Sequence, residues 1–190
     1  SDVYKRQFMT RTGDEDVSIN DRARFNRAHN TDLFVSIHHN ANAQNDASMN
    51  RTEVFWHWHD DGGPSEDAAR LLLRELQAAY GLPNSKAYLC WAYGVLRENS
   101  YPAILGEASY LANPEEEKRL QDPAHLQKQA DAYFRAIEAF FAGGRPQVLL
   151  VPGSDPGRTR VLQAAILQPD ALSLLDPQRV RAELDGAPLD

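Results

Sequence analysis

The chain has 190 residues, of which 42% are hydrophobic and 25% are charged, and its formal net charge is −7. This acidic balance excludes the basic surface that nucleic-acid binding requires, and no apolar run approaches the roughly 18 residues that span a membrane. The single cysteine, Cys90, excludes an internal disulfide. We interpret Cys90 as a small buried side chain rather than a nucleophile.

Strand-like and helix-like segments alternate along most of the chain. In chain order, the pattern predicts the end of a strand at 8–12, a helix from Ser18 or Asn20 to about 29, strands at 33–37 and 52–56, a helix from 62–65 to about 80, a short strand at 94–96, a strand at 103–106, and helices beginning near 113 and 122. Strands that alternate with helices are typical of βα units. The sequence therefore predicts an α/β fold, three-layer αβα, with a mostly parallel twisted sheet.

Polar and proline residues mark the expected helix ends. Asn113-Pro114 and Asp122-Pro123 each place a cap before a proline, and Gly81 is placed to end the preceding helix. The last helix runs to about residue 141. Its expected apolar stripe consists of Leu126, Ala130, Tyr133, Phe134, Ile137 and Phe141.

The two ends of the chain differ from this pattern. Residues 1–7 match no strand or cap signal, and we interpret them as a non-native scar. After residue 143 the chain becomes rich in proline, with a strand expected at 148–151 and a helix at 158–167. We therefore divide the chain into 1–7, an α/β domain at 8–143, and a tail or the start of a further segment at 144–190.

Two apolar runs each end in a polar side chain that can bind a metal or carry a proton. His38 follows the run 33–37, and Glu107 follows the run 102–106. Because ligands of open α/β sheets bind beyond the carboxyl ends of strands, we expect these side chains to converge at one rim of the sheet. Taken alone, such a histidine is more often structural, and such a glutamate is often a helix cap or an ion-pair partner.

Several segments, in order, resemble one enzyme family. Residues 32–42 (DLFVSIHHNAN) resemble the "DLFVSIHANA" signature of zinc-dependent N-acetylmuramoyl-L-alanine amidases of the amidase-3 type. Residues 9–14 with 20–22 are similar to the upstream "TR…D…L..R" stretch of that family. Residues 95–97, 102–107 and 111–116 are similar to its "VLR…PAVLVE.GFLSNPEE" stretch. The matches extend from about Phe8 to Phe141.

The resemblance implies roles for both side chains. His38 would be a ligand of zinc, the implied cofactor, and Glu107 would be the catalytic carboxylate beside it. The family's other two ligands, a His in a "DPGHGG" turn and a Glu in the next helix, lie upstream of the segment matched at Thr10. We therefore expect an N-terminal truncation that removes the first strand and helix of the family fold. Such a chain would fold poorly, hold zinc weakly and be impaired as an enzyme.

The resemblance also implies a reaction and a place. The family cleaves the amide between N-acetylmuramic acid and L-alanine in peptidoglycan, which implies a bacterial source and a periplasmic or extracellular location. Zinc lowers the pKa of a bound water to about 7, and a nearby carboxylate can take its proton. The alternative hypothesis is a non-catalytic module of the same fold that binds or regulates at the cell wall.

A second group of side chains could also carry chemistry. On a strand, His57 and His59 would share one face and form a second metal site, and a more distant hypothesis adds His38 to them as ligands of a different metallohydrolase. We favour an exposed strand end that enters a polar loop. The aromatic side chains that could line a sugar or peptide groove, but more often serve packing, are Trp56, Trp58, Trp91 and Tyr93.

Overall fold

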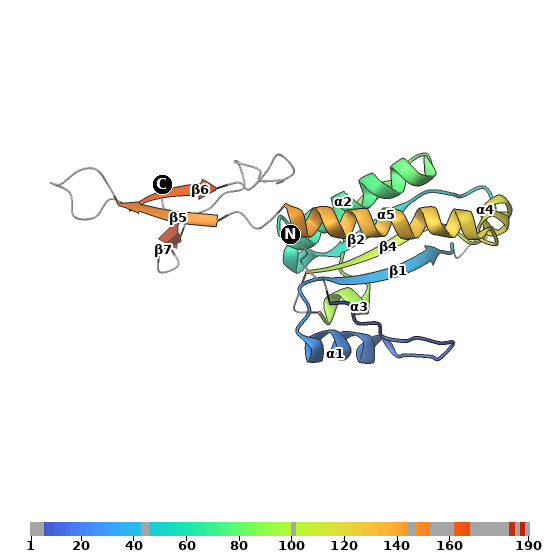
Figure 1. Cartoon of the computed structure of the whole chain (residues 1–190), viewed down its shortest axis with the longest axis horizontal. Helices are drawn as coiled ribbons and strands as arrows, with labels where there is room; N and C mark the ends of the chain where they lie inside the picture. Colours follow the sequence, from blue (N-terminus) through green and yellow to red (C-terminus); the bar gives the residue numbers. More distant parts are fainter. Residues whose placement is uncertain are drawn as a thin grey trace. The chain divides into compact units, whose positions relative to one another are not determined.

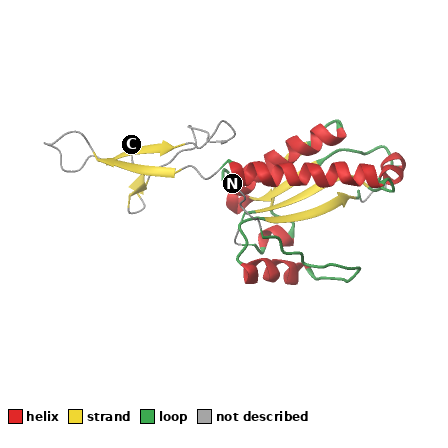
Figure 2. Ribbon diagram, viewed as in Figure 1, coloured by secondary structure: helices red, strands yellow, loops and turns green. Residues whose placement is uncertain are grey.

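The computed structural model describes residues 6–42, 46–99 and 102–143, together with the backbone of four strands beyond residue 146. The chain divides into two units, 1–137 and 138–190. The first unit holds a four-stranded sheet with helices on both of its faces (Figures 1 and 2). The two units are described separately below.

The sheet is mixed, with two parallel pairings and one antiparallel pairing. Its strands are β1 (Phe34–Asn40), β2 (Glu53–His57), β3 (Lys86–Cys90) and β4 (Ala103–Tyr110). Their order across the sheet is β1-β4-β2-β3. β1 runs parallel to β4 and β2 parallel to β3, whereas β2 and β4 are antiparallel. The predicted α/β class with a mostly parallel sheet is confirmed. Because β2 is antiparallel to β4, the C-terminal ends of β2 and β3 lie at the opposite end of the sheet from those of β1 and β4.

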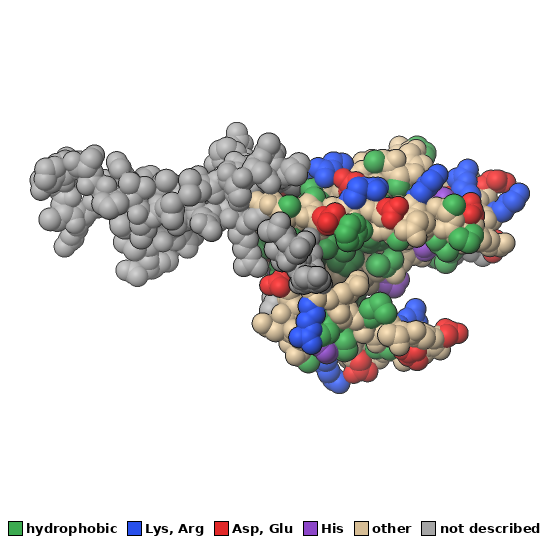
Figure 3. All heavy atoms as spheres, viewed as in Figure 1, with side chains coloured by type: hydrophobic (Ala, Val, Ile, Leu, Met, Phe, Trp, Pro, Cys, Tyr) green, Lys and Arg blue, Asp and Glu red, His purple; other side chains and the backbone are tan. Residues whose placement is uncertain are grey.

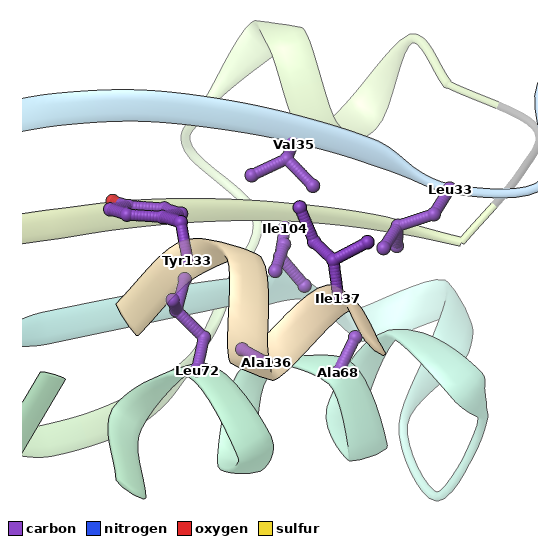
Figure 4. A pocket seen from close by; sticks show the side chains of 8 residues that line it. All are labelled: Leu33, Val35, Ala68, Leu72, Ile104, Tyr133, Ala136 and Ile137. Atoms are coloured by element: carbon purple, nitrogen blue, oxygen red, sulfur yellow. The ribbon is translucent and has the colours of Figure 1, made fainter. Parts of the chain in front are cut away.

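Helices cover the sheet from both sides. α2 (Pro64–Tyr80) and α5 (Pro123–Ala142) lie on one side, and α3 (Gly94–Arg97) and α1 (Ile19–His29) lie on the other (Figure 1). Two short elements, η1 (Trp58–Asp60) and α4 (Pro114–Arg119), follow β2 and β4. Figure 4 shows the apolar packing between the first pair of helices and the sheet, where side chains from β1, β4, α2 and α5 surround a small pocket.

The predicted helix ends are confirmed by their hydrogen bonds. The side chain of Ser18 accepts from Asp21 N at the start of α1, and that of Asn113 accepts from Glu116 N at the start of α4. Gly81 ends α2 with a φ of 62°, in the left-handed region that glycine adopts at low cost.

Two expectations for the first unit are wrong, and one strand was not predicted. Residues 8–12 form no strand. Residues 94–96 form the helical turn α3 rather than a strand, because Val95 and Leu96 pack together against Ala103 and Leu105 of β4. The strand of this region is instead Lys86–Cys90, which the sequence analysis did not assign.

The stripe predicted for α5 is only partly right. Leu126, Phe134 and Phe141 are exposed. The buried positions are Gln129, Ala132, Tyr133 and Ala136, at the i, i+3, i+4, i+7 spacing of one helix face. The face turned to the sheet is therefore set by small residues and one tyrosine rather than by the largest apolar side chains.

The described strands of the second unit form short antiparallel pairs. β5 (Gln147–Pro152) pairs with β6 (Leu162–Leu167), and β7 (Glu183–Leu184) pairs with β8 (Ala187–Pro188). The strand predicted at 148–151 is confirmed. The helix predicted at 158–167 is wrong for 162–167. A short apolar run fits both a helix and a strand, and here the residues pair with β5 as a strand. Residues 158–161 of that prediction, and 1–5 of the predicted scar, lie outside the described residues.

Among the described helices, none has the length and apolar character needed to cross a lipid bilayer.

Candidate active site

The structure places His38 and Glu107 side by side. They are Cα partners in the parallel pairing of β1 with β4. Partners in a ladder carry their side chains on the same face of a sheet, so the imidazole and the carboxyl group project to the same side. The two segments that the sequence analysis singled out, 69 positions apart, therefore converge near the ends of their strands.

The shared face is the one on which α3 packs. Ala103 and Leu105, the preceding residues of β4 on this face, are covered by Val95 and Leu96 of α3. Glu107 follows one step further along the strand, beyond that apolar contact. Figure 3 shows the surface hollowed between the sheet and the segment that carries α1, on the side toward which the arrow of β1 points in Figure 1. The site thus lies where helix cover gives way to an opening.

Glu107 has the environment of a proton carrier. Its residue surface is only 6% exposed, and its buried Oε2 atom has no hydrogen-bond partner among the described residues. Burial, with an added contribution from the negative charge of nearby Glu53, raises the pKa of Glu107 to about 7. A carboxyl group with this pKa gains and loses its proton near neutral pH, as general acid–base catalysis requires.

His38 is exposed beside this carboxyl group, and its ring makes a hydrogen bond with a residue of its own strand. Its Nε2 atom lies 2.9 Å from the hydroxyl oxygen of Ser36, two residues earlier on the same face. Partial desolvation lowers the pKa of His38, and the positive charges of Arg22, His39 and Arg11 lower it further. This lowering of the pKa favours the neutral imidazole, which is the form that binds metal ions. Ser36 was not predicted as a hydrogen-bond partner of His38, although it lies two residues earlier on the same predicted strand.

A second buried carboxylate, Glu53, flanks Glu107 on its other side. Glu53 is the antiparallel partner of Glu107 on β2 and is 5% exposed. Its carboxylate accepts hydrogen bonds from Asn40 Nδ2, Arg51 Nε and the hydroxyl of Tyr110, at 2.6, 2.8 and 2.8 Å. Sequence analysis placed Glu53 in a strand but assigned it no role, because the pairing partner of a strand is not readable from local pattern.

His39 belongs to the opposite face of the sheet. Its Nε2 atom lies 3.1 Å from Oε1 of Gln129 on α5, and the hydroxyl of Tyr80 donates to the same oxygen at 3.2 Å. Neighbouring strand residues alternate between faces, so His39 serves the contact between β1 and α5 rather than the site of His38.

The histidines at 57 and 59 lie at the other end of the sheet. Glu53 is level with Glu107, and His57 lies four residues further along β2, about 13 Å away along the strand. The strand ends there, so His59 lies in η1 and its backbone N–H donates to Nδ1 of His57. The hypothesis that these two histidines join His38 around a metal is wrong. Residues 6–42, 46–99 and 102–143 contain no group of three metal-binding side chains.

The tryptophans and Cys90 also lie apart from Glu107. Trp56 is buried, whereas Trp58 and Trp91, which directly follow β2 and β3, are 52% and 76% exposed. Tyr93 packs edge-on against Phe55, with 5.0 Å between ring centroids. Cys90 is half-buried, as the register partner of His57, rather than fully buried as expected.

The structure thus combines a three-layer α/β domain with an imidazole and a buried carboxyl group that are in register near the ends of two parallel strands. A family model described as N-acetylmuramoyl-L-alanine amidase matches residues 3–139. The chain therefore belongs to the amidase-3 family of N-acetylmuramoyl-L-alanine amidases.

Individual relatives agree with this family. The chain is 30% identical over 134 residues to the "Probable cell wall amidase LytH" of Staphylococcus aureus, a match over 70% of this chain and 42% of LytH. It thus spans less than half the length of the curated relatives that it matches. The catalytic domain of CwlV, an N-acetylmuramoyl-L-alanine amidase from Bacillus (Paenibacillus) polymyxa var. colistinus, is 26% identical with a TM-score of 0.62 over 70% of each chain. The N-acetylmuramoyl-L-alanine amidase from Clostridium difficile 630 shares the fold, with a TM-score of 0.64 and 24% identity over 71% of each chain.

Proposed function

We propose that residues 8–143 belong to the catalytic domain of a peptidoglycan amidase. The reaction is hydrolysis of the amide between N-acetylmuramic acid and L-alanine. The observation that carries this proposal is the register pairing of His38 with Glu107, whose buried carboxyl group has a pKa raised to about 7. Family membership supplies the substrate class. For the same reason we propose a bacterial source and a periplasmic or extracellular location, where peptidoglycan lies.

We propose His38 as a zinc ligand within this site. Hydrolytic zinc sites use three protein ligands and keep one position open for water or substrate. The described residues hold no group of three His, Cys, Asp or Glu side chains that would bind a metal. The described residues therefore do not complete a zinc site. We expect zinc to be held weakly by the chain as described, with less than one equivalent retained on purification.

Glu107 is the proposed proton carrier. It takes a proton from the attacking water as the water oxygen bonds to the lactyl carbonyl carbon, and it returns a proton to the nitrogen of L-alanine as the C–N bond breaks. The products are a carboxyl group on the muramic acid and a free amine on the peptide. The unpartnered Oε2 atom suits this role because no other described donor competes for it.

Release of soluble fragments from dye-labelled peptidoglycan tests this proposal. Mass spectrometry of the products should show peptides with a free N-terminal L-alanine. Replacement of Glu107 by Gln should lower the rate at least about 100-fold, because a general acid–base group contributes about 10²–10⁴. The control Glu117→Gln, at an exposed carboxylate on α4, should leave the rate unchanged. Equal rates for Glu107→Gln and wild type would contradict the role of Glu107.

The metal role of His38 needs its own measurement. His38→Ala should lower the zinc content after dialysis against a zinc buffer, and the control His59→Ala, at an exposed histidine in η1, should not. Identical zinc binding by the wild type and His38→Ala would contradict the assignment.

A second candidate function is a non-catalytic module that binds the cell wall. The incomplete set of metal-binding side chains favours it. Co-sedimentation with insoluble peptidoglycan distinguishes the two functions. A binding module should sediment with the polymer, release no fragment at any zinc concentration, and keep its binding in Glu107→Gln.

A further inference from the structure

The pairing of β1 with β4 contains an irregularity directly after the candidate site. His38 pairs with Glu107, but the next pair is Asn40 with Tyr110, so β1 advances by two residues while β4 advances by three. β4 therefore carries one extra residue, as in a β-bulge. Bulges locally increase twist and redirect side chains, and they are common beside active sites.

The extra residue changes the face on which Tyr110 lies. In a regular strand, a residue three positions after Glu107 would project to the opposite face. Here the hydroxyl of Tyr110 donates to Oε2 of Glu53, whose side chain shares the face of Glu107. The bulge thus brings Tyr110 to the face of the candidate site.

One carboxylate holds both sides of this bulge. Oε2 of Glu53 accepts from Asn40 Nδ2 at 2.6 Å and from the Tyr110 hydroxyl at 2.8 Å, and these are the two residues that pair after the irregularity. Oε1 of the same group accepts from Arg51 Nε at 2.8 Å, and the Arg51 guanidinium lies 5.6 Å from the centroid of the Tyr110 ring. The bond from Tyr110 is buried, since Glu53 is 5% and Tyr110 3% exposed, and the bonds from Asn40 and Arg51 are partly buried.

We propose that Glu53 is a positioning residue, whose carboxylate fastens the bulge and thereby holds His38 and Glu107 side by side. It acts from β2, the strand on the far side of β4, so one group connects all three strands that form the site. The catalytic consequence rests on the proposed function, whereas the fastening itself is a property of the folded chain. Misplacement of a catalytic group by about 1 Å can cost about 100-fold in rate, which makes such fastening significant.

Two substitutions test the fastening in the full chain without added metal. Glu53→Gln replaces one acceptor oxygen by a donor, so the carboxamide cannot accept from both Arg51 and the Asn40–Tyr110 pair. Tyr110→Phe removes a single hydroxyl. The matched control is Glu66→Gln, which changes another glutamate of 5% exposure that accepts from an arginine, Arg70, at the start of α2.

The measurements are amide hydrogen exchange, and NMR of the His38 ring and the Glu107 carboxyl carbon. In both test variants, exchange of amides 38–40 and 107–111 should rise about fivefold to tenfold, the effect of one lost buried hydrogen bond, while α2 stays unchanged. The His38 and Glu107 resonances should shift. In the release assay kcat should fall about tenfold with KM unchanged. Glu66→Gln should leave the exchange of amides 38–40 and 107–111, the His38 and Glu107 resonances, and kcat unchanged.

Unchanged exchange and resonances in variants that melt at the wild-type temperature would overturn the proposal. If Glu53→Gln does not fold, Tyr110→Phe alone decides. If the wild-type chain releases nothing from peptidoglycan, the proposed function fails, and exchange and NMR still decide whether Glu53 fastens the bulge.

Discussion

The two ends of the four-stranded sheet carry similar side chains in different surroundings. At one end, His38 is exposed beside Glu107, whose buried oxygen has no described partner. At the other end, His57 is in register with Cys90, but its ring is buried and the chain turns directly into η1. The first end combines an accessible imidazole with a carboxyl group whose pKa is raised toward neutral pH. At the second end, the imidazole is buried.

The largest expected effect on stability concerns the packing behind Glu107. A Cβ atom on Gly106 would lie 2.3 Å from the hydroxyl oxygen of Tyr133 and 2.9 Å from Cδ2 of Leu72. Gly106→Ala should therefore lower the free energy of unfolding by about 3 kcal/mol, through overpacking and loss of the hydrogen bond from Tyr133 to the Gly106 carbonyl. Urea denaturation measures it. Gly94→Ala is the control, because its nearest contact is Cγ2 of the exposed Ile19 side chain at 3.2 Å. Equal losses of unfolding free energy in Gly106→Ala and Gly94→Ala would show that Gly106 is packed no more tightly than Gly94.

A pH-dependent effect should distinguish the two ends next. The pKa of Glu107 is about 7 in the folded chain and near its ordinary value of 4.5 when unfolded. The folded state therefore keeps a proton that the unfolded state has lost between these pH values. The stabilisation from Glu107 is complete below pH 4.5 and is lost as pH rises through 7. Relative to the wild type, Glu107→Gln should be about 2 kcal/mol more stable at pH 8 than at pH 5.

Urea denaturation at the two pH values, with a chelator present, provides the measurement. A stability difference between Glu107→Gln and wild type that is the same at pH 5 and pH 8 would refute the raised pKa. Glu117→Gln serves as the comparison at an exposed position.

The smallest effect is expected at the other end. His57→Phe removes a buried Nε2 atom that has no hydrogen-bond partner among the described residues, together with the Nδ1 atom that accepts one long hydrogen bond of 3.4 Å from His59 N, and it keeps an aromatic ring at this position. Replacing an unsatisfied polar group by an apolar one is close to neutral, so stability should change by less than about 1 kcal/mol. Peptidoglycan release should not change. A large loss of peptidoglycan release in His57→Phe would show that the His57 end of the sheet also contributes to activity.

Local signals predicted the elements well where one short segment decides the outcome. The cap at Asn113 and the left-handed glycine at 81 each depend on a few neighbouring residues, and both were correct. For the first helix the sequence left Ser18 and Asn20 open, and the structure has Ser18 as the cap. The run at 94–96 was assigned wrongly because a short apolar segment fits both a strand and a helical turn, and packing against β4 decided it.

The site was predictable to the extent that it follows from strand ends. His38 and Glu107 each terminate an apolar run, and their convergence required only that the two strands be parallel neighbours. Glu53 was not predictable in the same way, because β2 runs antiparallel to β4 and its register depends on contacts 54 residues apart. Ser36 and Tyr110 are recognisable as partners only once the faces of both strands are known.

The extra residue of β4 makes the count of amino acids between Glu107 and Tyr110 as important as their identity. A deletion of either Ala108 or Ser109 would leave the tyrosine two positions after Glu107, on the same face of a regular strand, but would remove the bulge and its added twist beside the site. An insertion elsewhere, such as in the exposed stretch that precedes α1, would leave strand phase intact. We therefore expect homologous chains to vary in length around this strand but to keep the two-residue spacing inside it.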